Sequence, residues 1–250
     1  MTNNVSISCI DYQIFTGRLS DVFTHEKTLI NTINQYSYCI AEEDDFFKKA
    51  LKESDILLPD GIGIVSAVRL LNKKKIQKIA GADIHHFLLK DLNLKKGKCF
   101  YLGAASETLQ KIENRITKEF PNIKVATFSP PYKNEFSSSD NKTMIDKVNN
   151  FKPDVLFVGM TAPKQEKWAY QNKESLDAKI ICSIGAVFDF YAGTVARPHN
   201  FWINLGLEWF VRLLKEPRRM SKRYLYYGPV FIKLIMIEKI KNTKKTFLRS

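Results

Sequence analysis

The stretch that decides the fold is residues 153–172, PDVLFVGMTAPKQEKWAYQN. Residues 153–158 form an apolar run that favours a strand, and Gly159 ends it. Residues 164–172 have a helical pattern, and Pro163 stands near the first turn, where a missing N–H is tolerated. A strand, a glycine turn and a helix in this order are the repeating unit of a parallel α/β sheet.

The same order recurs along the chain. Strand-like runs at residues 54–59, 98–102, 125–128 and 179–184 alternate with helical patterns at residues 64–71, 107–120 and 142–151. We therefore predict an α/β protein with an open, mostly parallel, Rossmann-like sheet and helices on both faces. Ligands of such sheets bind beyond the carboxyl ends of the strands. One edge should therefore collect the glycine turns that follow Pro59, Leu102, Val158 and Ile184.

The charge of the chain is concentrated at its C-terminal end. Of 250 residues, 44% are apolar and 26% charged, which excludes disordered and collagen-like classes. The net charge is +13, yet residues 201–250 hold 12 Lys/Arg against 3 Asp/Glu. We predict an α/β catalytic domain over residues 1–199 and a helical, basic, membrane-associating appendage over residues 200–250. Such an excess favours an anionic partner: nucleic acid, a phosphorylated metabolite or an anionic membrane surface.

The cysteines and the apolar runs indicate in which cellular compartment the protein resides. Cys9, Cys39, Cys99 and Cys182 lie far apart without metal-ligand spacing, so we expect reduced core residues and no metal site. The N-terminus lacks the pattern of a signal peptide. The longest apolar run of the tail, residues 230–237, is short and contains Lys233. We predict a cytoplasmic protein that binds peripherally to the inner face of the cell membrane.

One carboxylate stands at a predicted strand end. In Leu58-Pro59-Asp60-Gly61-Ile62-Gly63 the glycines allow the backbone to approach a ligand closely. Asp60 has two interpretations: a helix N-cap, which the local sequence favours, or a general base at the ligand edge.

Two more strand ends carry candidate ligand groups. Gly103 opens a helix whose free N–H groups suit a phosphate, although neither G-x-G-x-x-G nor a P-loop is present. Lys164, Gln165 and Glu166 follow Gly159 at a helix start. They form either a charged, capped first turn or a ligand site, and three different polar groups modestly favour the site.

The tail combines arginines with aromatic residues. An amphipathic pattern over residues 206–216 predicts a helix that Pro217 ends. The basic residues Arg218, Arg219, Lys222 and Arg223 follow. A charge run is most often a solvated face. Here the interleaved aromatics suit anionic headgroups or a diphosphate. Tyr224, Tyr226 and Tyr227 would also suit stacking on bases, so a basic nucleic-acid-binding module is the alternative function.

At these residues the chain resembles the WecG/TagA/CpsF family, glycosyltransferase family 26. The resemblance runs from about Thr32 to about Tyr227, and its most specific elements are Pro-Lys-Gln-Glu and Glu-Trp/Glu-Pro-Arg. The matching pieces are Thr32-Ile33-Asn34, Leu58 to Gly63, Gly81-Ala82-Asp83, Gly103, Gly159 with Pro163 to Trp168, Gly185 with Phe188-Asp189 and Ala192-Gly193, and Gly206 to Trp209 with Arg212, Glu216-Pro217, Arg219 and Arg223-Tyr224.

The resemblance implies an inverting, metal-independent transferase without a cofactor. It would move a sugar, of the N-acetylmannosamine type or a hexose, from a UDP-sugar to a polyprenyl-diphosphate-linked acceptor in bacterial polysaccharide or teichoic acid synthesis. By the same resemblance Asp60 is the base, with Thr32 and Asn34 beside it. The donor would contact Gly61, Gly103, Gly159, Lys164, Gln165, Glu166 and Gly185. The acceptor diphosphate and the membrane would contact Arg212, Arg218, Arg219 and Arg223.

The chain also departs from the family pattern. Ala196-Arg197-Pro198 shifts an arginine by one position, Lys78 stands where an arginine is usual, and Ala80 replaces a threonine. The donor sugar therefore stays open. A donor-binding pseudoenzyme ranks below the transferase because Asp60 and Thr32 are both present. The tail has a second interpretation as an oligomer contact that buries its aromatics between subunits.

Overall fold

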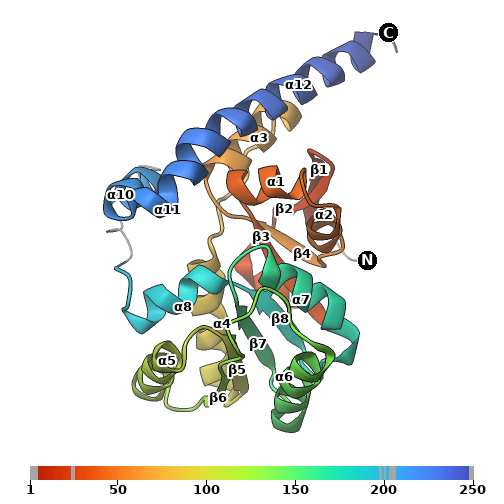
Figure 1. Cartoon of the computed structure of the whole chain (residues 1–250). Helices are drawn as coiled ribbons and strands as arrows, with labels where there is room; N and C mark the ends of the chain where they lie inside the picture. Colours follow the sequence, from red (N-terminus) through yellow and green to blue (C-terminus); the bar gives the residue numbers. More distant parts are fainter. Residues whose placement is uncertain (1–4, 24–25, 197–198, 200, 203–206, 248–250) are drawn as a thin grey trace.

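The computed structural model describes residues 5–23, 26–196, 199, 201–202 and 207–247 (Figure 1). Within these residues eight strands form one sheet in the order β1-β2-β4-β3-β8-β7-β5-β6. Neighbouring strands are parallel except β1 and β2, which form an antiparallel hairpin at one edge. The strands are β1 Ser6–Cys9, β2 Tyr12–Phe15, β3 Thr28–Ile33, β4 Ile56–Pro59, β5 Lys98–Gly103, β6 Lys124–Phe128, β7 Val155–Gly159 and β8 Ile180–Ser183.

Helices connect the strands and cover both faces of the sheet. The α-helices are α1 Gln35–Ala41, α2 Asp45–Lys52, α3 Ile62–Asn72, α4 Gly81–Lys95, α5 Ser106–Glu119, α6 Ser138–Phe151, α7 Lys164–Asn172, α8 Gly185–Ala192, α10 Glu208–Lys215, α11 Pro217–Ser221 and α12 Tyr227–Phe247. Short 3-10 turns η1 Leu19–Val22 and η2 Lys173–Ser175 and a π-helical segment η3 Lys222–Tyr226 complete the described elements.

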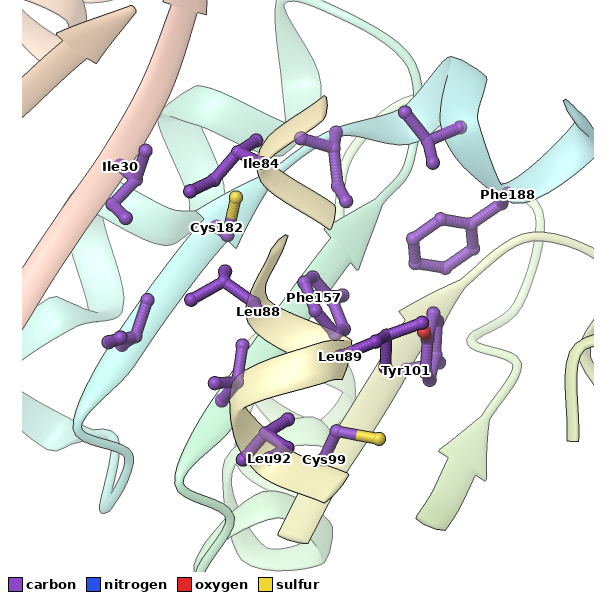
Figure 2. Packing of buried hydrophobic residues seen from close by; sticks show 14 of the residues in the cluster. Ile30, Ile84, Leu88, Leu89, Leu92, Cys99, Tyr101, Phe157, Cys182 and Phe188 are labelled. Atoms are coloured by element: carbon purple, nitrogen blue, oxygen red, sulfur yellow. The ribbon is translucent and has the colours of Figure 1, made fainter. Parts of the chain in front are cut away.

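Alternate strand residues pack on opposite faces, as the period of two in a strand requires. On one face, Ile30, Tyr101, Phe157 and Cys182 pack against α4, α5 and α8 (Figure 2). On the other face, residues such as Leu29, Phe100, Leu156 and Ile181 pack against α6 and α7. The central strands are buried on both faces, which explains why their sequences are continuous apolar runs rather than alternating ones.

A third cluster brings the C-terminal helix onto the N-terminal half of the chain. Tyr227, Phe231 and Ile235 of α12 recur every four residues, so they form one stripe on the helix. All three are buried with apolar residues of α1, α2 and α3. Figure 1 shows α12 (blue) as a long helix that runs beside α1 and α3 and then projects beyond them. The tail is therefore anchored by this stripe.

The predicted fold class is confirmed, and the predicted strands at residues 54–59, 98–102, 125–128, 153–158 and 179–184 all appear. The sequence reasoning missed the hairpin β1–β2, the strand β3 and the helices α1, α2, α4 and α8. The four cysteines are free and buried, as expected of core residues. Within the described part of the chain, no helix is long and apolar enough to cross a membrane.

Candidate active site

A cavity of about 690 Å³ lies at the carboxyl ends of the parallel strands. Residues that end or follow β3, β4, β5, β7 and β8 line it, so the predicted glycine turns do meet at one edge. The C-terminal elements α10 and η3 contribute further lining residues. Its volume is in the usual range for small-molecule sites.

Asp60 follows β4 and lines this cavity. Its backbone N–H donates to the carbonyl of Ile33 at 2.9 Å, which fixes the residue to the end of β3. The N-cap of α3 is Gly61, at φ 104°, and no side chain caps that helix. The interpretation of Asp60 as a helix cap is therefore wrong, and its carboxylate stays available to the cavity.

The surroundings of Asp60 change its acidity. Burial and the nearby Glu208 carboxylate raise the pKa of Asp60 to about 6, while Lys78 and Arg212 act in the opposite direction and Asp83 adds to the increase. The ordinary pKa of an aspartate is near 4, so folding makes this carboxyl a weaker acid. The physical reason is that α10 brings both a cover and a negative charge to the end of β4. A pKa nearer neutrality makes a carboxylate a stronger general base.

Thr32 and Asn34 lie next to Asp60 at the end of β3. Thr32 is paired in register with Leu58 of β4, and both Thr32 and Asn34 line the cavity. Asn34 is also the N-cap of α1: its Oδ1 accepts the backbone N–H groups of Tyr36 and Ser37, each at 3.0 Å. The side-chain oxygen of Asn34 thus holds the helix, which leaves its amide nitrogen for a ligand.

Gln165 and Glu166 form a buried pair on the first turn of α7. The Gln165 Oε1 accepts the N–H groups of Met160 at 3.3 Å and Gly185 at 3.1 Å, and its Nε2 donates to Glu166 Oε1 at 2.9 Å. Burial raises the pKa of Glu166 to about 7. Glu166 Oε2 is buried and has no hydrogen-bond partner among the described residues. Both side chains line the cavity, so this carboxylate can accept a ligand donor.

Glycines allow these strand ends to approach one another. A Cβ on Gly103, at φ 124°, would lie 2.1 Å from the carbonyl oxygen of Gly159, and the Ala104 N–H donates to that oxygen at 2.9 Å. A Cβ on Gly185 would lie 2.3 Å from Gln165 Oε1. Gly61, Gly159 and Gly185 line the cavity. Gly103 does not line the cavity, whereas the next two residues, Ala104 and Ala105, do.

Lys164 lies outside the cavity lining. Its Nζ hydrogen-bonds the carbonyl oxygen of Lys133 and lies 3.6 Å from the centre of the Phe136 ring. The three polar residues after Pro163 therefore lie in two places. Gln165 and Glu166 face the cavity, and Lys164 packs on the loop before α6. Successive residues of an α-helix are rotated by about 100° around its axis, so adjacent side chains need not share a face.

Of the four arginines predicted to contact the acceptor diphosphate, two line the cavity. Arg212 of α10 and Arg223 of η3 line the cavity; their guanidinium carbons lie 5.4 Å and 4.5 Å from the ring centres of Phe190 and Tyr36, respectively. The Arg212 Nε is buried and has no partner among the described residues. Arg218 is exposed and outside the lining. The Arg219 side chain and Arg197 lie outside the described part of the chain.

Two charged residues of the site were not chosen from the sequence. Lys78, before α4, and Glu208, at the start of α10, both line the cavity, and Lys78 Nζ lies 3.1 Å from Glu208 Oε2. The sequence marks Lys78 only as a departure from the family pattern. Glu208 belongs to the Glu-Trp element of the family resemblance, and this element is the feature of the sequence that could have identified it as a site residue.

The tyrosines of the tail do not form a platform for bases. Tyr227 is buried in the cluster around α12, Tyr224 lines the cavity and packs on Trp209 with a centroid distance of 5.8 Å, and Tyr226 is exposed. This arrangement disfavours the nucleic-acid interpretation. Among the described residues, no group of three or more His, Cys, Asp or Glu side chains is placed to hold a metal ion.

Most of the chain matches known proteins. The model of the glycosyl transferase WecG/TagA/CpsF family matches residues 2–245. An N-acetylglucosaminyldiphosphoundecaprenol N-acetyl-beta-D-mannosaminyltransferase of Bacillus subtilis (strain 168) is 33% identical over 220 residues, which cover 88% of this chain and 82% of that protein. A protein of the same description from Staphylococcus aureus (strain MW2) is 26% identical over 239 residues, covering 92% and 91% of the two chains. Together with an α/β sheet whose strand ends carry the quoted motifs around one cavity, these matches show that the chain belongs to the WecG/TagA/CpsF family of glycosyltransferases.

Proposed function

We propose that this glycosyltransferase moves N-acetylmannosamine from a UDP-sugar to N-acetylglucosamine carried on undecaprenyl diphosphate, a step in teichoic acid synthesis. The relatives from B. subtilis and S. aureus carry a name that describes this transfer. The observation that carries the proposal is the cavity itself: the Asp60 carboxylate faces a space that Lys78, Arg212 and Arg223 also line. A base and several cations suit a reaction that breaks a bond to a diphosphate.

In the proposed reaction Asp60 accepts the proton of the acceptor hydroxyl. The resulting oxygen nucleophile attacks the anomeric carbon of the donor from the side opposite to UDP, the bond between that carbon and the diphosphate oxygen breaks, and UDP leaves. One such displacement inverts the anomeric carbon, which agrees with the beta linkage in the relatives' names. Thr32 and the Asn34 amide, beside Asp60, would orient the acceptor hydroxyl.

The leaving diphosphate gains negative charge as the bond breaks. We assign its stabilisation to Arg212, Arg223 and Lys78, because positioned cations in a cavity of low dielectric stabilise such charge strongly. Gly61, Gly159, Gly185 and Gln165 would hold the donor at the strand ends, where close backbone approach is possible. In this assignment Glu166 Oε2 accepts a hydroxyl or N–H group of the donor.

The same proposal includes binding to the inner face of the membrane, where the acceptor lipid resides. Ile232, Met236 and Ile240 form an exposed apolar stripe on α12, and Phe210 and Leu214 are exposed on α10. Basic residues flank them, and each contributes about 1 kcal/mol of attraction to an anionic leaflet. Apolar contact and positive charge together suit peripheral binding.

Vesicle binding tests the membrane contact. The double substitution Ile232→Asp with Met236→Asp should abolish co-sedimentation with phosphatidylglycerol vesicles at low salt, whereas Leu94→Asp, at an exposed position of α4, should leave it intact. Equal binding by both variants would contradict the assignment. A loss of self-association in the double variant, with no vesicle binding by the unaltered chain, would assign the stripe to a contact between subunits.

A donor screen tests the reaction. Purified protein is incubated with a panel of UDP-sugars and a lipid-linked N-acetylglucosamine acceptor, and released UDP is measured with the saccharide product. We expect UDP-N-acetylmannosamine to be used and UDP-glucose and UDP-galactose to be used far less. Transfer from another UDP-sugar would overturn the donor assignment, and no transfer from any of them would overturn the proposed activity.

A further inference from the structure

Helix α10 lies over the catalytic cavity although none of its residues is fully buried. Trp209, Phe210 and Leu214 are exposed large apolar residues of this helix. The following helix α12, by contrast, is fixed by its stripe of three buried side chains. Because α10 has no buried apolar stripe, its position at the mouth of the cavity depends on polar contacts.

One ion pair joins α10 directly to the sheet domain. Lys78 Nζ lies 3.1 Å from Glu208 Oε2 across 130 positions of the chain, and the two side chains are 25% and 22% exposed. Lys78 precedes α4, and Glu208 is the first residue of α10. Exposed ion pairs stabilise a fold by only about 0–1 kcal/mol, but partial burial reduces solvent screening and strengthens the contact.

The position of α10 decides which charges reach Asp60. Arg212 lies one helical turn after Glu208, and both residues line the cavity, as does Arg223 of η3. The ionisable groups that act on Asp60 are Glu208 and Arg212 from α10, Lys78 from the segment before α4, and Asp83 from α4, and Asp60 in turn acts on Tyr224 of η3. A helix held at this point therefore delivers one carboxylate and one guanidinium to the base at the same time.

We infer that Glu208 is a positioning residue whose ion pair with Lys78 holds α10 across the cavity and thereby sets the charge around Asp60. This inference rests on the proposed function, because it takes Asp60 as the base. Glu208 itself does not touch the reacting atoms. It fixes the geometry in which Arg212 faces the diphosphate and Asp60 faces the acceptor hydroxyl.

The pH dependence of kcat/KM separates this role from a merely structural one. Glu208→Gln removes a negative charge near Asp60 and releases Lys78 from its partner, so the acid limb of the profile should move to lower pH. Lys78→Met breaks the same pair and releases α10, so Asp60 loses its cover and the Glu208 charge together; because these two raise the pKa of Asp60 more than Lys78 lowers it, the limb should again move to lower pH. Each shift should be about half a pH unit or more. The charge-exchanged double variant, Glu208→Lys with Lys78→Glu, restores the ion pair and should return close to the unaltered profile, and Asp91→Asn, which breaks the Lys95–Asp91 ion pair of α4, should not move it.

A second measurement does not depend on activity. Hydrogen exchange of the α10 amides in the ligand-free chain should become about 3- to 10-fold faster in Glu208→Lys and in Lys78→Glu, and the charge-exchanged double variant should restore slow exchange. Unchanged exchange in both single variants would overturn the inference, as would acid limbs that stay in place or move in opposite directions. Failure of the unaltered chain to transfer sugar would instead overturn the proposed function, and the exchange result would still decide the role of the pair.

Discussion

The edge of the sheet and the C-terminal segment that covers it contribute to one cavity but are held in place differently. Asp60, Gln165 and Gly185 are fixed by hydrogen bonds that involve the backbone of the strand ends and of the turns after them. The C-terminal residues Glu208, Arg212 and Arg223 reach the same cavity from α10 and η3, and the stripe on α12 anchors this segment.

This difference suggests a division of roles. In the proposed function, Asp60 and the strand-end turns, which need a fixed geometry, lie on the sheet, and two of the three proposed diphosphate-binding cations, Arg212 and Arg223, lie on the C-terminal segment. Elements with few buried contacts open at a lower free energy than the core does. In the proposed function, the cover would open for the acceptor while Asp60 and the strand-end glycines stay in place.

The largest expected effect is on the sheet side. Asp60→Asn keeps the shape but removes the proposed base, so turnover should fall by about 10²- to 10⁴-fold while UDP-sugar binding is retained. Steady-state kinetics and calorimetric titration measure the two quantities. Asp146→Asn, at an exposed position of α6, is the control and should behave as the unaltered chain.

The stability of Asp60→Asn provides a further check. A carboxyl whose pKa is raised on folding favours the protonated form, so the stability it contributes is present below pH 4 and is lost as the pH rises through about 6. At neutral pH the Asn variant should therefore melt at or above the temperature of the unaltered chain. Turnover within about threefold of the unaltered chain would exclude Asp60 as the base.

The second prediction concerns the anchor of the tail and the proposed division of the chain at residue 200. Phe231 is buried and its neighbour Ile232 is 63% exposed on the same helix. Phe231→Ala should reduce the free energy of unfolding by about 3–5 kcal/mol, and Ile232→Ala should change it by less than about 0.5 kcal/mol. Denaturant titration compares them. Equal, small effects would mean that the tail is an independent appendage that the catalytic domain does not need.

The third prediction concerns the contact between two strand ends. Gln165→Ala removes the acceptor of two backbone N–H groups and the donor to Glu166, so it should cost about 1–3 kcal/mol of stability. It should also weaken UDP-sugar binding about tenfold or more, because the turns after β7 and β8 lose their common support. Gln171→Ala, exposed on the same helix, is the matched control. Loss of stability without any change in donor binding would restrict Gln165 to a structural role.

The smallest expected effect is a pH dependence. A base acts in its deprotonated form, so kcat/KM should decline as the pH falls through about 6, the raised pKa of Asp60, and reach half its plateau there. The unfolding free energy measured at each pH distinguishes this decline from loss of the fold. A half-maximal point near pH 4 would mean that α10 does not cover Asp60 in solution.

Local patterns were sufficient for the central sheet. The strands β5, β7 and β8 are buried on both faces and therefore read as continuous apolar runs, and the glycines that end or follow them mark the sheet edge. Asp60, Gln165 and Glu166 were found because they follow such runs. The N-terminal part gave no comparable signal: β3 contains the buried Asn31, and the turn between β1 and β2 uses Ile10 and Asp11 at positive φ, where Asn-Gly would be typical.

The sequence by itself determined the fold class, the edge at which the cavity lies and the family, because these depend on the period of apolar residues and on motifs of neighbouring positions. Only the tertiary structure decided that Gln165 and Glu166 face the cavity and Lys164 does not, that Arg212 and Arg223 line it and Arg218 does not, and that Lys78 meets Glu208. It also decided the raised pKa of Asp60. The physical reason is that burial and charge at one atom are sums over everything packed around it, and residues such as Glu208, far away along the chain, become neighbours of Asp60 only when α10 folds over the sheet.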